Sequence, residues 1–188
     1  MSIEDTLARA FTARRFQLWL VGGALRDGEL GRPSPDRDYA TDALPDQIEE
    51  IAAAIGVRTV NVGRRFGTIG MSVGDRWVEV TTFRGESYRD GTRWPDVTFG
   101  TSIDEDLSRR DFTMNALARN VTTGEVLDPF DGRADIHEGI IRCVGDPVRR
   151  FREDPLRILR AARFVSQLDF GLDPETAAGM ANTAARMS

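Results

Sequence analysis

Apolar and polar residues follow two different periods along this chain, which predicts a mixture of helices and strands. Residues 2–14 repeat apolar side chains at every third or fourth position, as in an amphipathic helix that packs on a sheet. Residues 16–21 are a short, mostly apolar run that predicts a buried strand. This strand ends at Gly22-Gly23, and residues 24–27 then read as the first turn of a helix.

The middle of the chain is rich in strand patterns. A turn over residues 31–35, with two prolines, leads into a strand that carries Asp36 and Asp38. Residues 42–55 predict a helix, and residues 57–83 predict three strands. Residues 84–95 are polar, contain glycine and show no periodicity, so we expect a mobile loop there.

The last third is mainly helical. Ser108 is expected to cap a helix, residues 122–125 a hairpin turn, and residues 139–144 a short strand. A long helical pattern starts at Pro147, but the proline at position 155 predicts a kink or a fresh start near residues 153–154. A further helix is expected from residue 173 to the end.

Composition narrows the class of protein. A chain of 188 residues with 40% hydrophobic and 29% charged residues is typical of a globular domain, and no run is long enough for a membrane span. The single cysteine, Cys143, fits a reducing cytoplasm. The net charge of −5 argues against a general nucleic-acid binder, although all 25 basic residues are arginines. One isolated histidine, His137, argues against a zinc site or a serine–histidine–aspartate triad.

The junction between the first strand and its helix carries the candidate chemistry. Gly22 and Gly23 allow backbone N–H groups to approach an anion at a helix start, and Arg26 is near enough to add a phosphate contact. Alternation on the next strand places Asp36 and Asp38 on one face. Taken singly, the glycines predict a turn and the acids a solvated strand edge. Together they predict metal-assisted phosphoryl chemistry, with Asp36 and Asp38 as metal ligands.

Glu79 is an unusual residue within the strand pattern of residues 76–82. It lies between apolar neighbours, where an unpaired carboxylate is costly to bury. One interpretation is an edge residue paired with an arginine. The other is a third catalytic carboxylate beside Asp36 and Asp38.

These strings resemble a known family. LVGGALRD followed by DRDYATDA, then VEVTTFR, RRDFTMNALA and EDPLRILRAARF, are similar to the motifs of polymerase-β-type nucleotidyltransferases. The closer resemblance is to the bacterial class II tRNA nucleotidyltransferases, the CCA-adding enzymes, and to the bacterial poly(A) polymerases. It covers most of residues 16–170. It implies an α+β fold, in which a mixed, mostly antiparallel sheet flanked by helices forms a head over residues 1–138. Residues 139–188 would then begin an all-helical neck that is cut short.

The resemblance also implies roles for the RRDFT segment. By analogy with the family, Arg110 contacts the phosphates or sugar of a nucleotide, Asp111 helps to read the ribose hydroxyl, and Asn115 is a weaker candidate of the same kind. The alternative is an arginine pair that is neutralised by neighbouring acids on a wet surface.

The EDPLR segment is where the resemblance places base recognition. Asp154 accepts from the exocyclic amine of C or A, and Arg157 donates to a ring acceptor, whereas the carbonyl of G or U faces the carboxylate and is repelled. Arg160 and Arg163 support this site or reach phosphates. The alternative is a helix face on which arginines and acids pair in solvent.

The activity implied by the resemblance is template-independent addition of C and A from CTP and ATP to the 3′ end of tRNA, with two Mg²⁺ ions and in the cytoplasm. Two alternatives stay open. One is an A-adding enzyme or a poly(A) polymerase, and the other is a nucleotide-binding fragment without turnover of its own. The sequence gives no indication of the oligomeric state.

Overall fold

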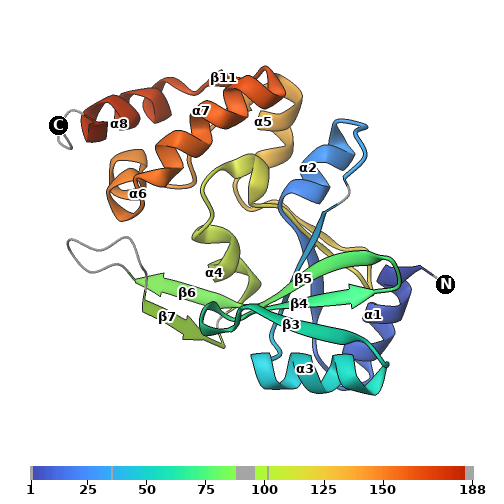
Figure 1. The fold of residues 1–188 in the computed structure, drawn as a ribbon. Coiled ribbons are helices and arrows are strands. Elements are labelled where there is room, and N and C mark those ends of the chain that lie inside the picture. The colour runs from blue at the N-terminus through green and yellow to red at the C-terminus, as the bar shows by residue number, and fades with distance from the viewer. Residues whose placement is uncertain (1, 35, 88–95, 101, 185–188) are drawn as a thin grey trace.

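A seven-stranded sheet forms the centre of the larger part of the molecule (Figure 1). The computed structural model describes all residues except 1, 35, 88–95, 101 and 185–188. Among the described strands of this sheet, only the neighbours β2 and β5 are parallel, and the other neighbours are antiparallel. The sheet order is β3 (Arg58–Gly63), β4 (Thr68–Val73), β5 (Arg76–Thr82), β2 (Arg37–Thr41), β1 (Leu18–Val21), β8 (Ala118–Asn120) and β9 (Val126–Leu127).

The two faces of the sheet are covered by different helices. Helices α1 (Ile3–Thr12) and α3 (Pro45–Ala54) pack on one face, where Leu20 and Tyr39 join their apolar side chains in one core. Helix α4 (Ile103–Ser108) packs on the other face against Val21 and Ala40. Successive strand residues point to opposite faces, so the short strands β1 and β2 contribute to both cores. The expected alternation within residues 76–82 is confirmed, because Val78 and Val80 are buried while Glu79 lies on the opposite face.

Helix α2 (Gly23–Glu29) stands at the end of β1 and begins at the paired glycines, as predicted. A tight turn at residues 74–75 joins β4 to β5. Of the expected turn over residues 31–35, Gly31 lies in a turn, and residue 35 lies outside the described residues. Three-residue 3₁₀ helices η1 (Arg64–Phe66) and η2 (Thr113–Asn115) complete this part of the chain.

A second, mainly helical region follows the sheet and lies above it in Figure 1. Its elements are α5 (Gly132–Glu138), β10 (Ile140–Ile141), α6 (Pro147–Glu153), α7 (Leu156–Leu168), β11 (Gly171–Leu172) and α8 (Pro174–Ala184). The core of this region also contains Phe112, Met114 and Leu117 from the RRDFT segment, so that segment joins the two regions. The division after residue 138 stays a prediction. The neck expected from residue 139 is not all-helical, because β10 and β11 pair in a parallel two-stranded sheet. The break between α6 and α7 at Asp154 confirms the expected interruption, and none of the helices in the described ranges is long and apolar enough to cross a bilayer.

Two local predictions were wrong. Ser108 does not cap a new helix; it ends α4, which Ser102 caps through the backbone N–H of Glu105. The apolar residues after it instead turn inward as η2. The expected loop over residues 84–95 begins with a strand, because β6 (Arg84–Ser87) pairs with β7 (Asp96–Phe99) in a separate hairpin. The remainder of that loop, residues 88–95, lies outside the described residues.

Candidate active site

Three carboxylates lie in neighbouring positions at one end of the sheet. Asp38 is the register partner of Glu79 on β5 and of Val21 on β1. Asp38 and Glu79 both lie on the sheet face that is opposite to α1 and α3, and Asp36 precedes β2 by one residue. The parallel pairing of β2 with β5 therefore brings Glu79 beside the acidic pair.

The electrostatic coupling of these acids is visible in Asp38. Solvent reaches its side chain, yet the surrounding protein removes enough water to raise the pKa of Asp38 above its ordinary value. The neighbouring carboxylate of Glu79 raises this pKa further, as does Asp36, and the guanidinium of Arg110 partly opposes them. The site thus holds more negative charge than its own cations neutralise.

A metal ion fits this donor set only with additional ligands. Within the part of the chain that the structure describes, no three His, Cys, Asp or Glu side chains converge closely enough to bind a metal alone. Mg²⁺ in nucleotide sites is usually held by one or two carboxylates together with phosphates and water. Asp36 and Asp38 offer such oxygen ligands, and their mutual repulsion with Glu79 favours a cation.

The paired glycines form the next part of the site. Gly22 has φ +69° and ψ −134°, a conformation that is essentially restricted to glycine, and it is the N-cap of α2. A Cβ atom at Gly22 would lie 3.1 Å from Nη1 of Arg110. The backbone at the helix start and the Arg110 guanidinium therefore lie against one another, next to Asp38. This arrangement suits an anionic group. We call the backbone of Gly22 and Gly23, together with the adjacent Arg110 guanidinium, the glycine cradle.

A chain of largely buried hydrogen bonds links the glycine cradle to the helical region. Arg26 donates from Nη1 to Oδ1 of Asn115 at 2.9 Å, and Asn115 donates from Nδ2 to Oδ1 of Asp111 at 3.1 Å. Oδ2 of Asp111 accepts from Nε of Arg160 on α7 at 2.7 Å. Arg26 also pairs with Asp27 at 2.8 Å. Because these groups bind one another, any contact of Arg26 or Asp111 with a nucleotide stays a prediction.

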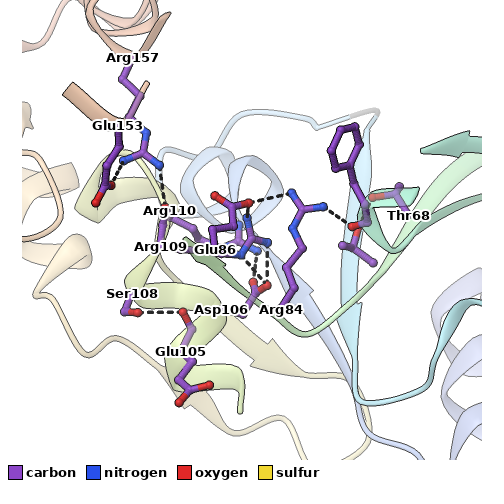
Figure 2. A network of polar contacts seen from close by, with 12 residues as sticks. Thr68, Arg84, Glu86, Glu105, Asp106, Ser108, Arg109, Arg110, Glu153 and Arg157 are labelled. Carbon is purple, nitrogen blue, oxygen red and sulfur yellow. Dashed lines mark hydrogen bonds and ion pairs between the residues drawn. The ribbon is translucent and has the colours of Figure 1, made fainter. Parts of the chain in front are cut away.

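A second network holds the arginine pair of the RRDFT segment (Figure 2). Asp106 is fully buried and accepts from Nη2 of Arg109 at 2.7 Å and from Nη2 of Arg110 at 3.0 Å. Burial would raise the pKa of Asp106, but these two arginines outweigh it and lower that pKa. Glu86 on β6 accepts from Arg109 at 2.8 Å and pairs with Arg84 at 3.1 Å. The expectation of arginines paired with acids is thus correct, but the pairs are largely buried.

The two candidates for base recognition have different surroundings. Arg157 is 5% exposed and donates from Nη2 to the backbone carbonyl of Arg109 at 3.1 Å, as Figure 2 shows. Asp154 is half-buried, and its Oδ1 accepts the backbone N–H of Leu156, the first residue of α7, at 3.0 Å. Each carboxylate has two oxygens, so this bond leaves one for a ligand.

Three arginines surround the ring of Phe164. The guanidinium carbons of Arg26, Arg160 and Arg163 lie 5.2, 5.6 and 5.0 Å from the ring centroid. Such cation–π contacts help to hold like charges close together. The result is a cluster of arginines around one ring, with Arg26 from α2 and with Arg160 and Arg163 from α7.

One cavity of about 1160 Å³ unites these parts. Every predicted site residue except Glu79 lines this cleft, and Glu79 lies beside Asp38 through the strand pairing. Sequence reasoning missed other lining residues, namely Arg32, Phe66, Arg84, Glu86, Arg109 and Phe164. It also missed Asp106, whose position in the sequence four residues before Arg110 was an available signal.

Comparisons with known proteins agree with this geometry. Residues 18–142 match the family of poly(A) polymerase head domains. The chain belongs to this family. The match includes the glycine cradle, the three carboxylates and the RRDFT segment, and it ends before α6 and α7.

Relatives with similar sequences include CCA-adding enzymes. The chain is 48% identical to the CCA-adding enzyme of Enterococcus faecalis over 92% of its length, and 49% identical to that of Bacillus subtilis over the same share. It covers 42% of each of these relatives, so it spans about two-fifths of their length.

Solved structures share the fold. The Bacillus stearothermophilus CCA-adding enzyme in complex with CTP has a TM-score of 0.82 and 43% identity, and the match covers 95% of this chain and 43% of that one. The Thermotoga maritima CCA-adding enzyme complexed with tRNA has a TM-score of 0.80 and 27% identity, over 98% of this chain and 42% of the other. The predicted α+β head with its mostly antiparallel sheet is confirmed.

Proposed function

We propose that this chain provides the catalytic and base-reading part of a template-independent nucleotidyltransferase that adds C and A to the 3′ end of tRNA. The proposal depends on one observation. Strand pairing places Glu79 next to Asp38, and Asp38 next to the strand end that leads into the glycine cradle, all at one end of an arginine-lined cleft. The similarity to CCA-adding enzymes supports the same substrates, CTP, ATP and tRNA. Such a reaction belongs in the cytoplasm.

The residues around the glycine cradle have different roles in the proposed reaction. The backbone at Gly22 and Gly23, with Arg110, holds the triphosphate. Asp36 and Asp38, with Glu79 beside them, would hold two Mg²⁺ ions, which would neutralise charge on the attacking and leaving oxygens. The primer 3′ oxygen bonds to the α-phosphorus, the bond to the β-phosphate breaks with its electron pair on the departing diphosphate, and the hydroxyl proton passes to solvent.

Base selection takes place at the other wall of the cleft. Asp154 and Arg157 form hydrogen bonds with the base edge of C or A. The hydrogen bond from Arg157 to the Arg109 carbonyl orients the remaining N–H donors of Arg157. Arg160 and Arg163 border the same wall and attract the phosphates. The substitution Arg157→Ala is therefore expected to relax the preference for CTP and ATP over UTP and GTP.

The test is incorporation of each labelled nucleotide into tRNA that lacks its 3′ end. The wild-type chain should incorporate C and A, while Asp36→Ala and Asp38→Ala should lose incorporation by several orders of magnitude and keep the fold. Glu105→Ala, an exposed acid on α4, is the matched control and should stay active. Normal turnover by either catalytic variant would refute the proposal.

A second candidate follows from the length of the chain, which covers about two-fifths of its relatives. In this alternative the chain binds CTP and does not transfer it. Calorimetry with CTP and Mg²⁺, beside the incorporation assay, separates the two. Binding without incorporation favours the second candidate, and elongation of long RNA with ATP alone would indicate a poly(A) polymerase.

A further inference from the structure

A second cavity lies next to the cleft, on the other side of α2. It has a volume of about 610 Å³ and is bordered by α1, α2 and the ends of β2 and β8. The two cavities share a wall made of Ala24 on α2 and of residues 32–34. Arg32 therefore lines both cavities, and the second one additionally contains Arg37 and Arg119.

The charges in this second cavity favour an anion. Arg37 donates to Glu4 at 2.9 Å, and Arg119 pairs with the other oxygen of the same carboxylate. No ion pair engages Arg32 within the described ranges of the chain. Glu29, the other acid of the lining, has its own partner in Arg133 at 2.9 Å. Arg37 and Arg119 thus share one carboxylate, and Arg32 adds a further positive charge to the lining, which leaves positive charge for a ligand.

The direction of the reaction points toward this cavity. Across the sheet, Glu79 on β5 neighbours Asp38 on β2, and Asp38 neighbours Val21 on β1, directly before the Gly22 cradle. In phosphoryl transfer the attacking and leaving oxygens lie roughly in line. If the attacking oxygen lies by Glu79 and Asp38, the diphosphate leaves on the side of the cradle and α2. The shared wall lies on that side, and the second cavity lies beyond it, on the sheet face that α1 covers.

We propose that the second cavity is a binding site for inorganic diphosphate, which passes over the shared wall from the cleft after transfer. This inference rests on the proposed function for the origin of the diphosphate, but not for its binding. Arg32 lines both cavities, so it can contact the anion before and after the transfer, and Arg37 and Arg119 hold it in the second cavity by charge-assisted hydrogen bonds. Glu4 holds Arg37 and Arg119 in position. Its negative charge also lowers the affinity of the cavity for diphosphate, so that the product is released.

The test is calorimetric titration of the chain with diphosphate at a fixed Mg²⁺ concentration, with and without saturating CTP. Because CTP fills the cleft, binding to the second cavity should persist when CTP is present. Arg119→Gln should weaken this binding about tenfold, as expected for the loss of one charge-assisted contact, and Arg119→Lys should restore part of it. Glu4→Gln should tighten it, because the carboxylate that opposes the anion is removed.

Matched controls are Arg9→Gln on the exposed side of α1 and Glu50→Gln on α3, which should leave the affinity unchanged. Thermal unfolding of each variant verifies the fold. Three results would overturn the inference. They are absence of diphosphate binding, loss of that binding on addition of CTP, and a diphosphate affinity in Arg119→Gln and Glu4→Gln that equals the wild-type affinity. Failure of the Asp38 incorporation test would instead refute the proposed function and leave this titration unaffected.

Discussion

Gly22→Ala tests whether the backbone conformation at the start of α2 is needed for nucleotide binding. The residue has φ +69° and ψ −134°, so an alanine there is strained by about 1–3 kcal/mol. For a chain of this size, 1 kcal/mol corresponds to about 2–4 °C, so the Tm should fall by about 2–12 °C. The new Cβ would also lie 3.1 Å from Nη1 of Arg110, which must move.

The displacement of Arg110 has a separate consequence for ligand binding. Arg110 is held by Asp106 at 3.0 Å and by the Asn115 carbonyl at 3.3 Å, so it cannot move away without weakening these bonds. Loss of one charge-assisted phosphate contact is expected to weaken CTP binding about tenfold. Thermal unfolding and calorimetry with CTP and Mg²⁺ measure the two effects independently.

Two other glycines in or next to α2 serve as controls. Gly31 also has a positive φ, +66°, but a Cβ there meets nothing within 4 Å, so Gly31→Ala should lower the Tm and leave CTP binding unchanged. Gly28 lies in the helix with open space around it, and Gly28→Ala should leave both unchanged or raise the Tm slightly. If Gly22→Ala bound CTP as tightly as Gly28→Ala, the reasoning about the cradle would be wrong.

Three further predictions concern charge, packing and reactivity. Because burial and neighbouring acids raise the pKa of Asp38, its ionised form destabilises the ligand-free fold. Asp38→Asn should therefore raise the Tm at pH 7 without metal, and this gain should shrink as the pH falls toward 4, where the wild-type carboxyl is protonated; a constant or growing gain would contradict the assignment. Gly132→Ala places a Cβ 2.2 Å from the Thr113 carbonyl oxygen, so it should lower the free energy of unfolding in urea by at least about 3 kcal/mol, and a wild-type midpoint would refute this. Burial raises the pKa of Cys143 to about 12, so a thiol reagent should label it only after unfolding, and rapid labelling of the native chain would show that it is accessible.

Much of the fold could be predicted because its signals are local. The strand before Gly22, the alternation around Glu79 and the break at Pro155 follow from residue type and period alone. The prediction failed at Ser108, where the apolar residues that follow have helical spacing but turn inward to fill the core beneath α6 and α7. Local periodicity does not tell which core an apolar residue will join, because that depends on elements far along the chain.

The sequence by itself determined the chemistry that is present: paired glycines at a strand end, acids on one strand face, and arginine-rich segments in the right order. Tertiary structure decided which of these groups meet. The parallel pairing of β2 with β5 brings Glu79 to Asp38, and the docking of α7 brings Arg160 to Asp111. The position of η2 beside α2 brings Asn115 to Arg26. Strand register and side-chain partners depend on long-range packing between separate elements, and no local period in the sequence encodes them.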